Sequence, residues 1–360
     1  MKGVFFMKVV NVNASQNYDI IIDRGLLSKC GEIVSKCVKT KRIAIVTDDI
    51  VDALYSDTVI SSLKDSGFEV SKYVFPNGEH SKCSDNLNNI YDFLIKNSIT
   101  RSDSVIALGG GVVGDITGYA CATYLRGVDY IQIPTTLLAQ VDSSVGGKTA
   151  IDIPAGKNLV GAFKQPKCVI CDIDTLNSLK PETFSDGMAE VIKYGMIRQK
   201  ELFDILISHN MDNIMDVIED VVYRCVSIKR DVVQNDEFDT GERMILNFGH
   251  TIGHSIEGYY HYDTYTHGSG VAIGMCIITE KAVKHGIGSK QMLDSLISCV
   301  KNYSLPTTVP AQLKDLLPLC CNDKKRDNDS ISIILCDDIG KCHIKKMLVT
   351  EFYDFMEVER

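Results

Sequence analysis

Side chains that could bind a metal ion are concentrated in the second half of the chain. Five of the eight histidines lie between residues 250 and 285, and His250 and His254 share one face of an expected helix. His267 follows them, and Glu190 precedes them on another expected helix. Glu190 with His250 and His267 would suit a catalytic zinc ion, because this donor set leaves positions open for water or substrate oxygen atoms. A helical histidine is more often structural, and the spacing leaves open whether His254 is a ligand or carries protons beside the metal.

A glycine-rich turn follows an apolar run in the first half of the chain. Residues 104–108 predict a strand, residues 109–114 match G-x-G-x-x-G, and a helical pattern runs over residues 116–124. Such glycines let the backbone approach a pyrophosphate, whose charge is stabilised by the free N–H groups of the helix start. Asp115 could bind a ribose or a nicotinamide. The spacing alone also fits a tight turn with no ligand, but the strand–turn–helix context favours a dinucleotide.

Basic and amide side chains in an expected polar loop region flanked by glycines could bind a phosphate. Lys148 ends Gly-Gly-Lys and Asn158 ends Gly-Lys-Asn. The segment resembles the end of a P-loop, but Asp142 occupies the position of the required upstream glycine, so a P-loop is excluded. Arg243 and Asn247 are four residues apart, and we expect them on the helix face of the two spaced histidines, holding a carboxylate or phosphate. The alternative for Lys148 and Asn158 is a solvated loop with no ligand. The alternative for Arg243 and Asn247 is that they are ordinary polar side chains of the surface.

The elements that must position these residues fall into two classes. In the first half, apolar β-branched runs alternate with helical patterns, which predicts a mostly parallel, Rossmann-like α/β sheet. Strands are expected at residues 8–13, 20–23, 42–47, 68–75, 104–108, 129–133 and 168–172. Helical periodicity dominates later, at residues 184–197, 202–207, 215–233, 243–259, 271–284 and 291–302, before a hairpin at 331–346. We expect an α/β nucleotide-binding domain at residues 1–177 and a mainly α-helical metal- and substrate-binding domain at 178–360.

Composition excludes several classes of function. The 360 residues carry a net charge of −9, a poor electrostatic match to nucleic acid. No apolar run approaches the ~18–20 residues that span a bilayer. The thirteen cysteines are scattered, and Cys168 and Cys171 lie in an expected buried strand, so they are interpreted as small apolar residues. With no signal peptide at the start, we expect a reducing, cytoplasmic location.

Seven segments together resemble the 3-dehydroquinate synthases, a family of sugar phosphate cyclases. The segments are Leu108–Asp115, Arg126–Gly127, Pro134–Ala139, Asp142–Thr149, Gly156–Asn158, Met188–Lys193 and Leu246–His254. The resemblance extends from the early strands to Asp323-Lys324-Lys325, and its motifs are long and jointly specific. It implies a carbon–oxygen lyase of the shikimate pathway of aromatic amino acid biosynthesis. The lyase would use NAD and zinc, with cobalt as the alternative metal, to convert 3-deoxy-D-arabino-heptulosonate 7-phosphate to 3-dehydroquinate and phosphate.

The resemblance also implies a reaction sequence. A ring hydroxyl is oxidised by tightly bound NAD, phosphate is lost by β-elimination, the ketone is reduced again, and the ring opens and closes by an aldol step. The oxidation matters most, because a ketone acidifies the adjacent C–H and so lets phosphate leave. In the family, zinc polarises the hydroxyl and then the ketone oxygen.

Residue roles follow from matched positions only. The implied metal ligands are Glu190, His250 and His267. The implied substrate contacts are Arg126, Asp142, Lys148, Asn158, Lys193, Lys229, Arg243, Asn247 and either Lys324 or Lys325. The implied catalytic residues are His254 for proton transfer, Asp239 at the family's proton-acceptor position, and Lys148, Lys193 and Arg243. The implied NAD contacts are Asp48, Glu79, Lys82, Gly110, Gly111, Asp115, Thr135, Thr136, Lys157, Thr175 and Ser178. Arg126 is expected to reach the phosphate bound by a neighbouring subunit, which requires at least a dimer, and we expect a homodimer.

The chain departs from the family pattern at two positions. Asp239 is one methylene shorter than the usual glutamate, which puts its proton-acceptor role in doubt. Ser269 replaces the glutamate that usually follows His267-Gly268, so the groups that orient His267 are expected to differ. Neither departure touches the three expected metal ligands.

Three other functions are compatible with parts of the pattern. A sister cyclase would act on another sugar phosphate, and a metal-dependent polyol dehydrogenase would accumulate NADH and would not need Lys148, Asn158 and Arg243 as anion clamps. A catalytically inactive binding or scaffold protein would not need an intact metal-ligand set.

Overall fold

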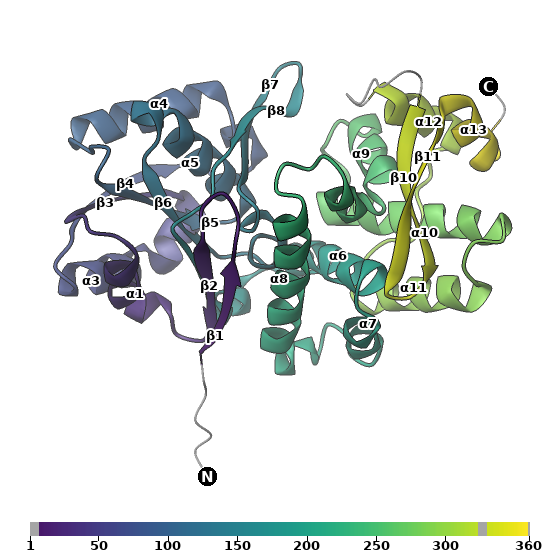
Figure 1. The fold of residues 1–360 in the computed structure, drawn as a ribbon, viewed down its shortest axis with the longest axis horizontal. Coiled ribbons are helices and arrows are strands. Elements are labelled where there is room, and N and C mark those ends of the chain that lie inside the picture. Colours follow the sequence, from purple (N-terminus) through teal and green to yellow (C-terminus); the bar gives the residue numbers. More distant parts are fainter. Residues whose placement is uncertain (1–6, 323–329, 359–360) are drawn as a thin grey trace, which may run out of the picture. The chain divides into compact units, whose positions relative to one another are not determined.

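The computed structural model describes residues 7–322 and 330–358, which form two compact units (Figure 1). The first unit is drawn from Met1–Lys180 and Lys229–Phe238, and the second from Pro181–Ile228 and Asp239–Arg360. The sequence had assigned residues 229–238 to the second domain. They join the first unit because Glu237 accepts hydrogen bonds from the Ser15 backbone N–H and from Gln165 Nε2, both at 2.8 Å.

A seven-stranded sheet forms the centre of the first unit. Its strands are β1 (Lys8–Val12), β2 (Tyr18–Asp23), β3 (Arg42–Asp48), β4 (Glu69–Phe75), β5 (Ser104–Gly109), β6 (Asp129–Pro134) and β9 (Cys168–Asp172). The order is β1-β2-β9-β6-β5-β3-β4, and every neighbouring pair is parallel except β1 with β2. The predicted mostly parallel α/β sheet is therefore confirmed. Cys168 and Cys171 are fully buried in β9, as expected for small apolar side chains.

Helices cover both faces of this sheet (Figure 1). They are α1 (Cys30–Cys37) and α3 (Asp57–Asp65) on one face, and α4 (Ser84–Lys96) and α5 (Gly111–Thr123) on the other, with the short α2 (Asp49–Val51) after β3. In β3, Ile43 and Ile45 pack with α1 and α3, whereas Ala44 and Val46 pack with α4 and α5. Strands covered on both faces carry continuous apolar runs, which is why the sequence located them well.

A second antiparallel pair, β7 (Lys148–Ile153) and β8 (Gly156–Phe163), forms a separate ribbon. The sequence had predicted a polar loop here, and this prediction was wrong. The lysines and glycines concealed a hairpin that packs against α5, where a Cβ on Gly118 would lie 2.4 Å from Thr149 Cγ2. Lys148 and Asn158 therefore lie on strands.

The second unit is mainly helical, as expected. Its elements are α6 (Pro181–Ile197), α7 (Lys200–Ile207), the first part of α8 (Ile218–Asn235), α9 (His250–Tyr259), α10 (His267–Lys284), α11 (Lys290–Asn302), α12 (Leu313–Asn322), β10 (Ser330–Asp338), β11 (Lys341–Leu348) and α13 (Val349–Phe355). The β10–β11 hairpin confirms the predicted one, with its turn between Asp338 and Lys341. Among the helices of the described residues, none has both the length and the apolarity needed to cross a membrane.

The helix predicted over residues 243–259 is broken in the structure. Residues 242–247 form a 3₁₀ helix, and α9 begins only at His250. Gly249 between them has φ +81°, and a Cβ there would lie 2.7 Å from the Val271 backbone oxygen. Arg243 and Asn247 consequently do not share a helix face with His250 and His254, because apolar periodicity cannot reveal a left-handed residue.

Candidate functional site

Three helices bring Glu190, His250 and His267 together in the second unit. Glu190 Oε1 lies 3.4 Å from His250 Nε2 and 3.6 Å from His267 Nε2. One ligand atom from each residue lies within 4.8 Å of the other two. Donor atoms at about 2.1 Å from a tetrahedral zinc ion are about 3.4 Å apart, so the arrangement fits zinc or a similar divalent cation.

Backbone features of α9 and α10 hold the two imidazoles in place. His250 is the first residue of α9, and its Nδ1 donates to the Phe248 carbonyl oxygen at 3.1 Å, which leaves Nε2 with its lone pair facing Glu190. His267 is the first residue of α10, where the Gly268 N–H donates to Asp186 Oδ1 on α6 at 2.6 Å. Since a Cβ on Gly268 would lie 2.1 Å from the Asp186 backbone oxygen, α6 and α10 approach closely at this point.

Electrostatics distinguish the two expected histidine ligands. Burial and the nearby Lys193 ammonium hold the pKa of His250 well below its usual range. Desolvation alone would lower the pKa of His267, but the carboxylates of Glu190 and Glu257 outweigh it and raise that pKa to about 10. His250 is therefore neutral and ready to bind a cation, whereas a cation at His267 must displace a proton.

His254 lies beside the cluster, with its ring centroid 5.4 Å from that of His250 and 5.9 Å from that of His267. His254, Glu257 and His267 form a second group whose ligand atoms lie within 4.8 Å of one another. Glu257 was not among the site residues expected from the sequence. Its only signal is the i, i+3 spacing from His254, and nothing in the sequence shows that the two residues meet the start of another helix.

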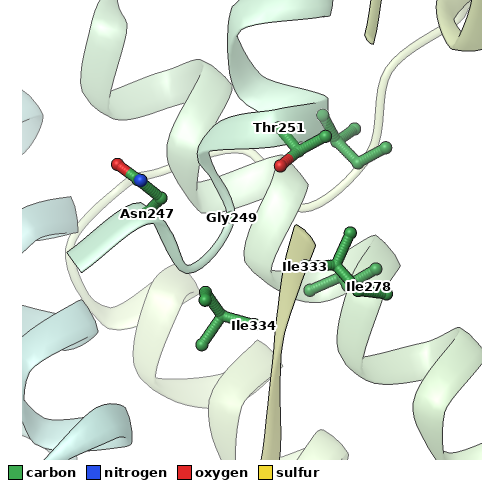
Figure 2. Close-up of a pocket in the computed structure, with 7 residues that line it drawn as sticks. Asn247, Gly249, Thr251, Ile278, Ile333 and Ile334 are labelled. Carbon is green, nitrogen blue, oxygen red and sulfur yellow. The ribbon is translucent and has the colours of Figure 1, made fainter. Parts of the chain in front are cut away.

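A small pocket near these residues is not the expected metal site. Figure 2 shows Asn247, Gly249 and Thr251 on one side of this pocket and Ile278, Ile333 and Ile334 on the other. Its lining is largely apolar and includes none of the three expected ligands.

Arg243, an expected substrate contact, is buried in the 3₁₀ helix that ends at Asn247.

The expected dinucleotide residues of the first unit gather at the carboxyl ends of its parallel strands. Asp48 is the last residue of β3, and Gly110 and Gly111 directly follow β5. Thr135 and Thr136 follow β6, and Thr175 and Ser178 follow β9. The β5 and β6 ends are joined by the Thr135 N–H, which donates to the Gly109 carbonyl oxygen at 3.0 Å. Open α/β sheets bind ligands outside this edge.

The start of α5 provides a cradle at the same edge. Gly110 is the N-cap of α5 and Gly111 its first residue. A Cβ on Gly110 would lie 3.1 Å from Thr136 Cγ2, and one on Gly111 3.3 Å from Ser143 Oγ. With no side chain here, a pyrophosphate can approach the N–H groups of the helix start, so these residues fit NAD.

Lys82 joins expected cofactor and substrate residues into one cluster. Its Nζ donates to Asp115 Oδ2 and to Asn158 Oδ1, both at 2.5 Å, and the side chain is buried. Desolvation alone would lower the pKa of Lys82, but Asp115 and Glu79 outweigh it and raise the pKa, so the ammonium stays charged. Lys157 Nζ lies 3.9 Å from Glu79.

A second buried lysine pairs with an expected substrate contact. Lys229 Nζ donates to the Asp142 backbone oxygen at 2.5 Å and lies 2.9 Å from Asp142 Oδ2. Lys148, on β7, is exposed. Lys82 and Lys229 are thus two buried ammonium groups of the first unit, each in contact with a carboxylate.

Of the remaining residues singled out by the sequence, those in the described part of the chain lie at helix ends or at a left-handed backbone position. Arg126 is exposed just beyond the C-terminal end of α5, about 20 Å along that helix from Gly111. Asp239 has φ +58° and begins the final part of the second unit. Ser269 lies in the first turn of α10, where its N–H donates to Oγ1 of the N-cap residue Thr266. Lys324 and Lys325 lie outside the described residues.

Family models and curated relatives both match 3-dehydroquinate synthases. Residues 72–186 match the family described as 3-dehydroquinate synthase N-terminal, and residues 187–326 match the one described as 3-dehydroquinate synthase C-terminal. A 3-dehydroquinate synthase of Clostridium acetobutylicum is 47% identical over 356 residues, which cover 98% of this chain and 100% of that relative.

Two solved structures share the fold. A 2-deoxy-scyllo-inosose synthase, complexed with carbaglucose-6-phosphate, NAD⁺ and Co²⁺, has a TM-score of 0.86 at 23% identity and covers 97% of this chain and 99% of its own. A 2-epi-5-epi-valiolone synthase from Streptomyces hygroscopicus, with NAD⁺ and Zn²⁺ bound, has a TM-score of 0.85 at 23% identity and covers 97% and 98%. At this identity the likeness concerns the fold.

Proposed function

This chain belongs to the 3-dehydroquinate synthase family, and from that premise we propose that it converts 3-deoxy-D-arabino-heptulosonate 7-phosphate to 3-dehydroquinate and phosphate. NAD and a divalent cation, zinc or cobalt, would be its cofactors. The observation that carries the proposal is the convergence of Glu190, His250 and His267 from three helices of a chain that matches the family along most of its length. The cyclases of the same fold, which hold NAD⁺ with Co²⁺ or Zn²⁺, support the cofactor assignment.

When bound, NAD supplies a hydride acceptor that later returns the hydride, and the cation supplies a Lewis acid for the reacting oxygen. Glu190, His250 and His267 would hold the cation. The backbone N–H groups at Gly110 and Gly111 would hold the pyrophosphate of NAD, with Thr135, Thr136, Thr175 and Ser178 at the neighbouring strand ends.

The chain's own polar residues supply binding and proton transfer. Lys148, Lys229 and Arg243 provide fixed positive charge, which suits the phosphate and carboxylate of the substrate. An imidazole nitrogen of His254 would accept a proton from the substrate and return it, since this ring lies beside those of His250 and His267. Lys193 donates to Glu190 and holds that carboxylate in place.

Two further features belong to the proposal. We expect a homodimer, in which Arg126 reaches the phosphate bound by the neighbouring subunit, since its position beyond α5 is remote from the strand edge within one chain. We also expect a cytoplasmic location, in keeping with described cysteines that form no disulfide.

The test is phosphate release from the heptulosonate phosphate by purified protein carrying zinc and NAD. We expect release that stops on metal chelation, resumes when zinc is restored, and leaves no net NADH. A control with another sugar phosphate should stay unreacted. Accumulation of NADH would point to a polyol dehydrogenase, and cyclisation of the other sugar phosphate alone to a sister cyclase.

A further inference from the structure

Glu257 is a buried carboxylate that none of the assigned roles uses. It lies on α9, one turn after His254, and only 7% of the residue is exposed. Its Oε1 lies 3.6 Å from Nδ1 of His267, whereas Nε2 of the same ring lies 3.6 Å from Oε1 of Glu190. The imidazole of His267 thus has one carboxylate facing each of its nitrogen atoms.

We propose that Glu257 is a positioning residue: its carboxylate faces Nδ1 of His267 and holds the remaining ring proton there when the cation displaces the other, so that the Nε2 lone pair is aimed at the cation beside Glu190. The inference rests on the proposed function, because it concerns the proposed metal site. A neutral imidazole carries one proton, and an ionised carboxylate can only accept a hydrogen bond. A carboxylate at Nδ1 therefore selects the tautomer whose lone pair is on Nε2, and it strengthens that nitrogen as a ligand.

Other polar groups next to His267 bind the backbone or each other, whereas Glu257 faces the imidazole ring. Thr266 caps the helix, since its Oγ1 accepts from the Ser269 N–H at 3.3 Å and donates to Ser269 Oγ at 2.9 Å, so these two side chains bind each other. Asp186 accepts from the Gly268 N–H and fixes the backbone. The backbone of His267 is thus held from α6 and by its own cap, and the rotation of its ring is restrained from α9.

Glu257 could instead be a ligand, together with His254 and His267, because these three also lie within 4.8 Å of one another. The contacts favour the positioning role. Glu190 Oε1 is close to the Nε2 atoms of two histidines, and the Nδ1 of one of them, His250, already donates to a carbonyl oxygen. Glu257 is close to the other nitrogen of His267, the one that faces away from Glu190.

The test compares zinc affinities of the full-length chain by competition with a chelator. We expect Glu257→Gln to raise the zinc Kd about 10- to 100-fold, to shift the visible absorption bands of the cobalt-loaded protein, and to be partly rescued by Glu257→Asp. The control Glu280→Gln removes an exposed carboxylate of α10 and should leave the Kd within about twofold. Urea unfolding of each metal-free variant shows whether it is folded.

Two results would overturn the inference. A zinc Kd and cobalt spectrum of Glu257→Gln that match the unsubstituted protein would leave Glu257 without a role at the metal. Loss of zinc as complete as in Glu190→Gln, with no rescue by aspartate, would make Glu257 a ligand. Both results differ from a failure of the proposed function, in which the unsubstituted chain itself would bind no zinc.

Discussion

Lys193 donates a hydrogen bond to Oε2 of Glu190 from one turn further along α6, while Oε1 of the same carboxylate faces His250 and His267. Glu190 and Lys193 are both almost completely buried. One oxygen atom is therefore tied to a fixed ammonium, and the other is presented to two imidazoles. The ammonium holds the carboxylate in the orientation that a cation needs.

Glu190→Gln should abolish stoichiometric zinc binding and lower the free energy of unfolding of the metal-free protein by about 3–5 kcal/mol, because Lys193 loses a buried carboxylate partner. Metal analysis after gel filtration and urea unfolding measure the two effects. Glu201→Gln, an exposed change on α7, is the control and should alter neither. One zinc ion per chain in Glu190→Gln would contradict the assignment.

Gly249→Ala should destabilise the protein by about 3 kcal/mol or more and weaken zinc binding. A Cβ at this left-handed position would lie 2.6 Å from Met275 Cγ and 2.7 Å from the Val271 backbone oxygen, so His250 must shift. Gly286→Ala is a matched control, with φ +75° and no atom within 4 Å of the added Cβ. It should cost only about 1 kcal/mol and leave zinc affinity unchanged. Equal costs at the two glycines would contradict the packing argument.

Gly111→Ala should weaken NAD binding at least about tenfold, or about 1.4 kcal/mol, while the free energy of unfolding without NAD changes by less than about 1 kcal/mol. The added methyl group would occupy the cradle at the start of α5 and contact the Ser143 side chain, at 3.3 Å from Oγ and 3.8 Å from Cβ. Gly109→Ala provides the contrast: its Cβ would lie 2.5 Å from Val113 Cγ2, so it should destabilise the fold by about 1–3 kcal/mol. Titration calorimetry with NAD measures the affinity. Unchanged affinity in Gly111→Ala would rule out this cradle.

Asp103→Asn should lower the free energy of unfolding at pH 7 by about 1–2 kcal/mol, and the difference should disappear in acid. Burial alone would raise the pKa of Asp103, but hydrogen bonds from Thr40 and Thr100, helped by the charge of Arg42, hold it below the ordinary 3.8. A lowered folded pKa stabilises the protein above pH 3.8, and this stabilisation is lost as the pH falls through the folded value.

Urea unfolding of the metal-free protein at a series of pH values measures this dependence. Asp92→Asn, which changes an exposed carboxylate of α4, should leave the free energy unchanged at every pH. A constant difference between Asp103→Asn and the unsubstituted protein down to pH 3 would show that the carboxylate charge does not contribute.

The sequence predicted the strands of the large sheet within one or two residues, because strands buried on both faces carry apolar runs that few other elements show. It failed for β7 and β8, whose lysines and glycines resemble an anion-binding loop. The sequence also predicted one continuous helix through Gly249, where the structure has a break. The apolar residues before and after the break keep the 3.6-residue spacing of a single helix, so the pattern hides it. Periodicity reports which faces are apolar and says nothing of a single left-handed φ.

For the site, the sequence identified residues by type and by motif but not the contacts among them. Glu190, His250 and His267 were expected to meet, and the structure brings them together. Glu257 was missed because its partner is on another helix, and the distance from α9 to the start of α10 depends on close packing that no local pattern records. The pairing of Lys82 with Asn158 depends on the unpredicted hairpin.

The chain passes between its two units at three points, after Lys180, Ile228 and Phe238. The segment 229–238 returns to the first unit, where the Gln234 side chain accepts from the Asn13 N–H and Glu237 binds Ser15. A fragment truncated at residue 180 would therefore leave these acceptors behind and lose the ammonium of Lys229 beside Asp142. A single proteolytic cut after Lys180 would not release residues 1–180, because the docked segment would still hold them to the rest of the polypeptide.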